Sequence, residues 1–390
     1  MNGASERMTP LLDWLMSDGR LAPSMGKFVD QLMTRAVAAG LPIWRFYIGL
    51  RVMHPQMAAT GILWRRGGGY EEIPRAHGIL ETSAYIGSPM QAVRESGKRV
   101  RFRLGELPDG AHGLLNELVA GGGTDYVAYP MRMSRDMSSP VASFATDRPD
   151  GFSDQDLADL ERLVDWMGAI AEIHFHRNIA ETVIDTYLGH IVGEQILGGL
   201  IKRGDGREIN AVLWFSDLRD FTGLNERMAA PELLELLNNY LQLVGDALAA
   251  NGGEILKFIG DGLLAIFPLS QPQACANLLH AVAEARQAMV ALNEKNSETG
   301  RAPLNYGIGV HVGDVMYGNI GSRTRLDFTV IGPAVNMASR LESLTKQLGR
   351  TVLLSRAFAD FVESDFNLER VGEYPVRGFN DPIELFAYHG

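Results

Sequence analysis

The sequence has one cysteine, no long apolar run and no surplus of basic residues. Cys275 cannot form a disulfide within the chain, which fits a reducing cytosol and excludes a zinc site built from cysteines. No segment reaches the roughly 18 uncharged apolar residues typical of a transmembrane helix. The first residues also lack the apolar stretch of a signal peptide. We therefore expect a cytoplasmic protein without a membrane segment.

Acidic residues outnumber basic ones in both halves of the chain. The counts are 24 to 19 in residues 1–200 and 23 to 17 in residues 201–390, and the net charge is −11. Because no basic tail or stripe is present, neither nucleic acid nor an anionic membrane is an expected partner. An anionic substrate would need a metal ion or a few local cations.

Length and composition are those of a folded protein with two or three domains. The 390 residues are 46% hydrophobic and 21% charged, which excludes a mainly disordered or collagen-like chain. In the first part, apolar spacing predicts a helix over residues 8–39 and strands over 43–53, 61–65, 125–133 and 141–146. Ser88 begins a predicted helix over 88–95, and Ser153 a long one that runs to about Ile184. The long helix is interpreted either as a rigid dimer stalk or as a helix packed on its own sheet.

The pattern of the second part of the sequence predicts a ferredoxin-like, split βαβ domain within an α+β fold. Strands are expected over 209–215, 254–259, 262–267, 304–312 and 328–331, and helices over 231–250, 273–292 and 335–348. The predicted divisions are an N-terminal domain at 1–180, a helical coupling segment at 181–204 and a second domain at 205–390.

Two aspartates and one helix face carry the candidate chemistry. Asp217 ends a strand and Asp261 lies in a Gly-Asp-Gly turn, so the split βαβ plan allows them to converge on Mg²⁺ or Mn²⁺. Backbone amides near Phe221 can hold a polyphosphate. Asn336 and Arg340 are four residues apart on a predicted helix and suit a ribose and a phosphoryl group. Each signal alone is also typical of ordinary turns and solvated helix faces.

Taken together, these motifs resemble the class III nucleotidyl cyclases over about residues 205–390. The resemblance lies in FSDLRDFT at 215–222, LKFIGDG at 256–262, GIGVHVGDVMYGNIG at 307–321 and DFTVIGPAVNMASRLE at 327–342. The four motifs occur in the order and spacing of the family. The preceding stretch at 185–197 is similar to the coupling segment found before such domains.

The resemblance implies a role for each matching residue. Asp217 and Asp261 would bind two divalent metal ions per active site, Mg²⁺ or Mn²⁺. Lys257 and Thr329 would read the purine ring in the combination that selects adenine. Asn336 would orient the ribose, and Arg340 would stabilise the transition state at the α-phosphoryl group. The remaining substrate-binding candidates are Phe221, Thr222 and Arg377.

Two positions depart from the family pattern. Arg377 stands where the family often has the lysine of a Val-Lys-Gly motif, which keeps the charge and alters its reach. Pro333 replaces the aspartate often seen before the catalytic helix, and proline is well tolerated at a helix start.

The resemblance also implies an adenylate cyclase that forms 3′,5′-cyclic AMP and pyrophosphate from ATP. Its active sites would be shared in a homodimer. One protomer would supply Asp217 and Asp261, and its partner would supply Lys257, Thr329, Asn336 and Arg340. The alternatives are a guanylate cyclase, or a silent module that binds nucleotide or a partner without turnover.

Residues 1–180 resemble a GAF-like or PAS-like sensor domain. The similarity lies in TDYVAYPM at 124–131 and ASFATDRPDGFSDQDL at 142–157. A small-molecule ligand of this domain is one option, and a role in dimerisation alone is another. Six aromatic residues are candidates either for a pocket or for the core, namely Trp44, Phe46, Trp64, Tyr85, Tyr126 and Tyr129.

Overall fold

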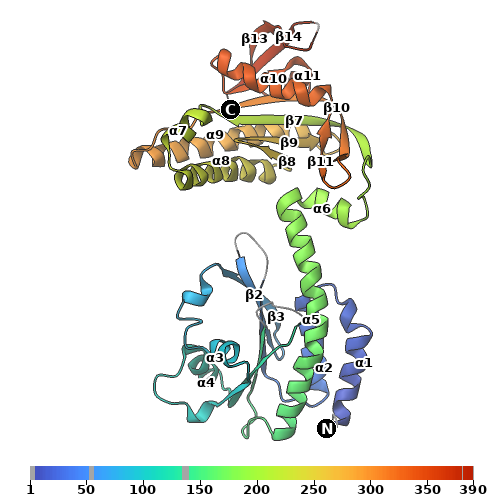
Figure 1. Cartoon of the computed structure of the whole chain (residues 1–390), viewed down its shortest axis with the longest axis vertical. Coiled ribbons are helices and arrows are strands. Elements are labelled where there is room, and N and C mark those ends of the chain that lie inside the picture. Colours follow the sequence, from blue (N-terminus) through green and yellow to red (C-terminus); the bar gives the residue numbers. More distant parts are fainter. Residues whose placement is uncertain (1–4, 52–56, 134–139, 380, 390) are drawn as a thin grey trace. The chain divides into compact units, whose positions relative to one another are not determined.

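The computed structural model describes residues 5–51, 57–133, 140–379 and 381–389. The chain divides into two compact units, Met1–Thr186 and Tyr187–Gly390 (Figure 1). Within the described residues, no helix combines the length and apolarity that crossing a membrane requires.

The first unit is built on a six-stranded antiparallel sheet. Its strand order is β3-β2-β1-β6-β5-β4. Its strands are β1 (Arg45–Arg51), β2 (Met57–Arg65), β3 (Gly69–Ala76), β4 (Val100–Arg103), β5 (Asp125–Pro130) and β6 (Val141–Thr146). Its helices are α1 (Thr9–Met16), α2 (Met25–Ala38), α3 (Pro89–Ser96), α4 (Gly113–Ala120) and α5 (Asp154–Leu188).

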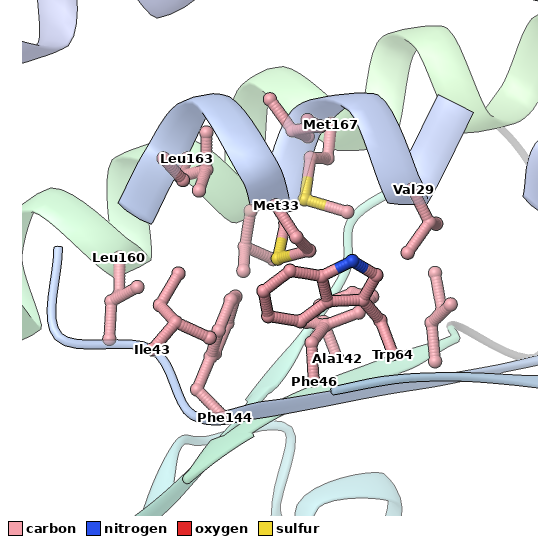
Figure 2. Close-up of a cluster of buried hydrophobic side chains, with 14 of the residues drawn as sticks. Val29, Met33, Ile43, Phe46, Trp64, Ala142, Phe144, Leu160, Leu163 and Met167 are labelled. Carbon is pink, nitrogen blue, oxygen red and sulfur yellow. The ribbon is translucent and has the colours of Figure 1, made fainter. Parts of the chain in front are cut away.

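Helices cover both faces of this sheet, and the side chains on both faces of β5 and β6 are accordingly buried. One core joins the sheet to α1, α2 and α5, and Figure 2 shows Phe46, Trp64 and Phe144 meeting side chains of the two longer helices. A second core, which contains Tyr126, lies under α3 and α4. Phe46, Trp64, Tyr126 and Tyr129 are therefore core residues. The arrangement is compatible with a GAF-like or PAS-like domain, which stays a prediction.

The helices α1, α2 and α5 test two of the sequence predictions. The helix predicted over residues 8–39 is wrong as one element, because α1 and α2 are separated by residues 17–24. Ala22 is extended before Pro23, and the Ser24 hydroxyl accepts a hydrogen bond from the Lys27 amide to begin α2. The long helix α5 packs on its own sheet, since its buried positions run from Asp156 to Phe175.

The second unit is an antiparallel sheet with one parallel pair, and it confirms the ferredoxin-like prediction. The main strand order is β13-β14-β12-β10-β7-β9-β8, with β11 paired to β10. Its strands are β7 (Gly206–Leu218), β8 (Glu254–Ile259), β9 (Gly262–Pro268), β10 (Tyr306–Gly321), β11 (Leu326–Ile331), β12 (Val352–Ser355), β13 (Leu368–Tyr374) and β14 (Ile383–Tyr388). Its helices are α6 (His190–Leu197), α7 (Phe221–Arg227), α8 (Ala230–Ala250), α9 (Ala274–Glu298), α10 (Pro333–Gln347) and α11 (Arg356–Ala359).

Within this unit, β7-α8-β8-β9-α9-β10 is the split βαβ core. α8 and α9 share one apolar core with the central strands. α6 and the first turns of α10 contribute to a second core on the sheet, together with β11. The ends of β7, β8 and β9 are thereby held in a rigid framework.

An ionic cluster with two buried carboxylates fixes the start of α5. Arg7 donates to Asp156 and to Asp159, in each case at 2.8 Å, and Arg148 pairs with Asp156. Ser153 and Asp156 also bond reciprocally in a capping box. Burial alone would raise the pKa of Asp156, but hydrogen bonds from Arg7, Ser153 and Arg148 outweigh it and lower that pKa to about 2.

We predict that Asp156→Asn destabilises the first unit by about 2 kcal/mol at pH 7. The lowered pKa means that the contribution of Asp156 is present above about pH 4 and is lost as the pH falls towards 2. Urea unfolding of the whole chain, followed by tryptophan fluorescence, measures the change, because Trp14, Trp44, Trp64 and Trp166 all lie in this unit.

The matched control is Glu161→Gln, which removes an exposed carboxylate that pairs with Arg99 at 3.4 Å. It should change the free energy of unfolding by less than about 0.5 kcal/mol. Equal effects of the two substitutions at pH 7 would contradict a special contribution from the buried cluster.

Candidate active site

The sheet brings Asp217 and Asp261 to the same edge. Asp217 is near the end of β7, and Asp261 is in the tight turn between β8 and β9. The β7–β9 register pairs Ser216 with Leu263, so Asp217 lies beside Gly262. A Cβ atom at Gly262 would be 2.7 Å from the Ser216 carbonyl oxygen and 2.9 Å from Asp217 Oδ1. The glycine after Asp261 is therefore required for the two aspartates to come together.

The two carboxyl groups interact strongly. Burial, the charge of Asp261 and a hydrogen bond between the two carboxyls raise the pKa of Asp217 to about 7. Two acids this close resist simultaneous ionisation, and a divalent cation would relieve their repulsion. The carboxylate oxygens are the hard ligands that Mg²⁺ and Mn²⁺ prefer.

The protein supplies only part of a metal's coordination shell here. Among the residues that the structure describes, no group of three or more His, Cys, Asp or Glu side chains is arranged to hold a metal ion. Two carboxylates with open positions suit Mg²⁺, which usually keeps waters and takes substrate phosphates as further ligands. The residues present thus fit a divalent cation that binds together with a phosphate-bearing substrate.

Lys257 and Thr329 come from adjacent parts of the unit. Lys257 lies on β8 and pairs with Asp327 of β11, two residues before Thr329. Asp327 and Thr329 share a strand face because strand side chains alternate. Sequence reasoning gave Asp327 no role, although its position two residues from Thr329 was a usable signal.

Asn336 and Arg340 lie one turn apart on the exposed face of α10. Neither side chain makes a hydrogen bond or ion pair with any residue that the structure describes. Both are therefore available to a ligand or to a second molecule.

The other predicted substrate-binding residues are Phe221, Thr222 and Arg377. Phe221 and Thr222 begin α7 directly after Asp220, whose φ of 57° is left-handed. Phe221 is half-buried against the core and Thr222 is exposed. Arg377 is exposed between β13 and β14, and no hydrogen bond or ion pair in the described chain connects it with the other candidates.

α10 approaches β10 unusually closely, and glycines make this possible. A Cβ atom at Gly309 would be 2.1 Å from the Ala338 carbonyl oxygen and 2.3 Å from the Glu342 amide nitrogen. A Cβ at Gly313 would be 2.9 Å from the Ala334 Cβ. The helix that carries Asn336 and Arg340 is thus seated by its backbone against the central sheet.

Comparisons with known proteins agree on the second unit. Residues 207–390 match the family model of the adenylate and guanylate cyclase catalytic domain. An adenylate cyclase of Anabaena cylindrica is 35% identical over 193 residues, which are 48% of this chain and 38% of that protein. Adenylate cyclase 1 of Rhizobium meliloti is 24% identical over 253 residues, 63% of this chain and 38% of that protein.

The chain thus spans 38% of the length of each of these two curated relatives. Among solved structures, the adenylyl cyclase CyaB from P. aeruginosa matches with a TM-score of 0.43 at 31% identity. That match covers 47% of this chain and 96% of the CyaB chain.

We predict that Gly309→Ala displaces α10 and lowers the free energy of unfolding of the second unit by about 2 kcal/mol. The added methyl group meets backbone atoms, which cannot rotate away as a side chain can. Differential scanning calorimetry of the whole chain provides the measurement.

Gly245→Ala in α8 is the control, because its Cβ would meet only Ile255 Cδ1 at an ordinary 3.4 Å. We expect Gly245→Ala to leave stability unchanged or to raise it slightly, since alanine favours helix. A Gly309→Ala protein as stable as the parent would show that the close approach is unimportant.

Proposed function

We propose that this chain, whose residues 207–390 carry a class III adenylate and guanylate cyclase catalytic domain, converts ATP to 3′,5′-cyclic AMP and pyrophosphate. The observation that carries the proposal is the convergence of Asp217 and Asp261 at one end of the sheet, with Lys257 and Thr329 on the strands β8 and β11.

The choice of ATP rests on the hydrogen-bonding chemistry of Lys257 and Thr329. A lysine ammonium group donates and cannot accept, so it suits the unprotonated N1 of adenine and not the N–H at N1 of guanine. A threonine hydroxyl can accept from the adenine amino group. The ion pair with Asp327 holds the Lys257 side chain near Thr329.

The reaction needs no covalent enzyme intermediate. The ribose 3′-hydroxyl loses its proton to solvent, and its oxygen attacks the α-phosphorus in line. The new P–O bond closes the ring as the bond from the α-phosphorus to the oxygen bridging to the β-phosphorus breaks, which releases pyrophosphate. Asp217 and Asp261 would hold two divalent cations, Mg²⁺ or Mn²⁺, which lower the pKa of the 3′-hydroxyl and neutralise the phosphates. Asn336 would orient the ribose, and Arg340 would stabilise charge on the α-phosphoryl oxygens.

We propose further that the active site is shared between two protomers. Exposed apolar side chains lie next to the base-reading residues: Phe258 and Ile259 on β8 are 53% and 45% exposed, and Ile331 on β11 is 51% exposed. Apolar groups gathered in this way are typical of an interaction surface. Asn336 and Arg340, which pair with no residue that the structure describes, are likewise available to a partner.

A complementation experiment tests the shared site. Asp217→Ala and Arg340→Ala should each be inactive alone. Co-expressed, they form mixed dimers in which one of the two sites combines an intact Asp217 with an intact Arg340. With random pairing, half of the dimers are mixed, so about a quarter of the parental cyclic AMP production should return.

An inactive mixture, with mixed dimers verified by two affinity tags, would contradict the shared site. If Asp217→Ala alone keeps full activity, the metal-binding role of this residue is wrong.

Lys257→Ala should lower kcat/KM for ATP at least tenfold, because the donor to the purine ring is lost. The loss should be smaller for GTP, so the ratio of ATP to GTP efficiency should fall. Lys295→Ala, which removes an exposed lysine from α9, serves as the control and should change neither value. An unchanged ATP-to-GTP ratio in Lys257→Ala would show that other residues read the base.

A further inference from the structure

Arg219 connects the metal-binding strand to α10. It follows the last residue of β7, and its backbone amide donates to the Asn305 carbonyl oxygen at 2.8 Å. Its guanidinium donates from Nη1 to Glu342 Oε1 at 3.2 Å and from Nη2 to Thr345 Oγ1. A planar guanidinium with two separate acceptors on one helix restricts both position and rotation.

The acceptors of Arg219 are interior groups. Glu342 is 5% exposed and Thr345 is fully buried. Burial raises the pKa of Glu342, the charge of Arg219 opposes this shift, and the charge of Asp261 adds to it. Removing Arg219 would leave a buried carboxyl group without its cation, which is far more costly than losing an exposed ion pair.

The sheet leaves room for this guanidinium at Gly307. Gly307 is paired with Asp217 in the β7–β10 ladder. A Cβ atom there would be 2.2 Å from Arg219 Nη2, 2.4 Å from Thr345 Oγ1 and 2.7 Å from Glu342 Oε1. The hydrogen-bonded group therefore lies directly over the strand residue opposite Asp217.

The same helix carries Arg340 two residues before Glu342. Arg340 lies on the exposed face of α10, whereas Glu342 and Thr345 lie on the buried face. In the shared-site dimer, Asp217 of a protomer serves one active site and Arg340 of that protomer serves the other. The contacts of Arg219 thus join halves of two different sites.

We propose that Arg219 is a positioning residue that couples the two active sites of the dimer, because it fixes α10 to the metal-binding strand within each protomer. The proposal rests on the proposed function. Through the contacts of Arg219 with α10, metal and phosphate binding at one site would alter the placement of Arg340 and Asn336 at the other site.

Mixed dimers with a single functional active site, called the live site here, distinguish coupling between the two sites from an effect of Arg219 on only one of them. One chain carries Asp217→Ala and the other carries Arg340→Ala, so the live site takes its metal half from the second chain and its α10 half from the first. Arg219→Ala is then added to the first chain only, where Asp217 is already absent. We expect kcat of the live site to fall on the order of tenfold, because a misplaced catalytic group is costly.

Further variants of the first chain sharpen the test. Glu342→Gln should lower kcat in the same direction, and the double substitution with Arg219→Ala should be less than additive. Arg219→Lys keeps the charge but not the two-pronged contact, so it should cause a smaller loss and guards against unfolding of the alanine variant. Arg370→Ala is the control. This exposed arginine pairs with Glu384 on β14 and not with α10, so its replacement should leave kcat unchanged.

The outcomes are distinct. A live-site kcat that is unaffected by Arg219→Ala and Arg219→Lys in the first chain, in mixed dimers that melt like the parent, would overturn the coupling role. Coupling predicts that Arg219→Ala lowers kcat of the live site from either chain, so a loss seen from only one of the two chains would mean that Arg219 serves a single half-site and would again refute the coupling. Failure of the starting mixed dimer to make any cyclic AMP would instead count against the proposed shared site.

Discussion

The mutual repulsion of Asp217 and Asp261 is the constraint around which the second unit is organised. Two partly buried carboxyl groups in contact are unfavourable without a cation, as the pKa of about 7 at Asp217 indicates. The β7–β9 ladder and the tight turn that ends at Gly262 nevertheless hold them together. The packing of the sheet thus holds two carboxyl groups together whose repulsion a divalent cation would relieve.

Much of the fold was predictable from local patterns. The ferredoxin-like core follows from apolar periodicity between β7 and β10, and the start of α5 follows from Ser153 and Asp156. The break between α1 and α2 was missed because both helices have apolar residues at helical spacing, whereas the effect of Pro23 on Ala22 is purely local. The strands β3, β4, β12, β13 and β14 were also missed, since a strand gains much of its stability from neighbouring strands and helices rather than from its own sequence.

The candidate site was predictable only as far as its motifs extend. The motif residues Asp217, Asp261, Lys257, Thr329, Asn336 and Arg340 lie on the strands, turn and helix expected for them, and their roles stay predictions. The contacts of Arg219 with Glu342 and of Lys257 with Asp327 join residues more than 60 positions apart, so only the packed structure reveals them. The need for glycine at positions 307 and 309 is likewise visible only in the packed structure, because α10 and Arg219 occupy the space that side chains would fill.

The central claim is that the second unit acts on ATP through a metal site built on Asp217 and Asp261. It is tested most directly by product analysis of the purified chain with ATP or GTP, each with Mg²⁺ and with Mn²⁺. The account predicts cyclic AMP from ATP, little cyclic GMP from GTP, and loss of product when either aspartate is replaced by alanine. Cyclic GMP as the main product would contradict the reading of Lys257 and Thr329, and no cyclic product from either the whole chain or residues 205–390 would contradict the proposed enzyme.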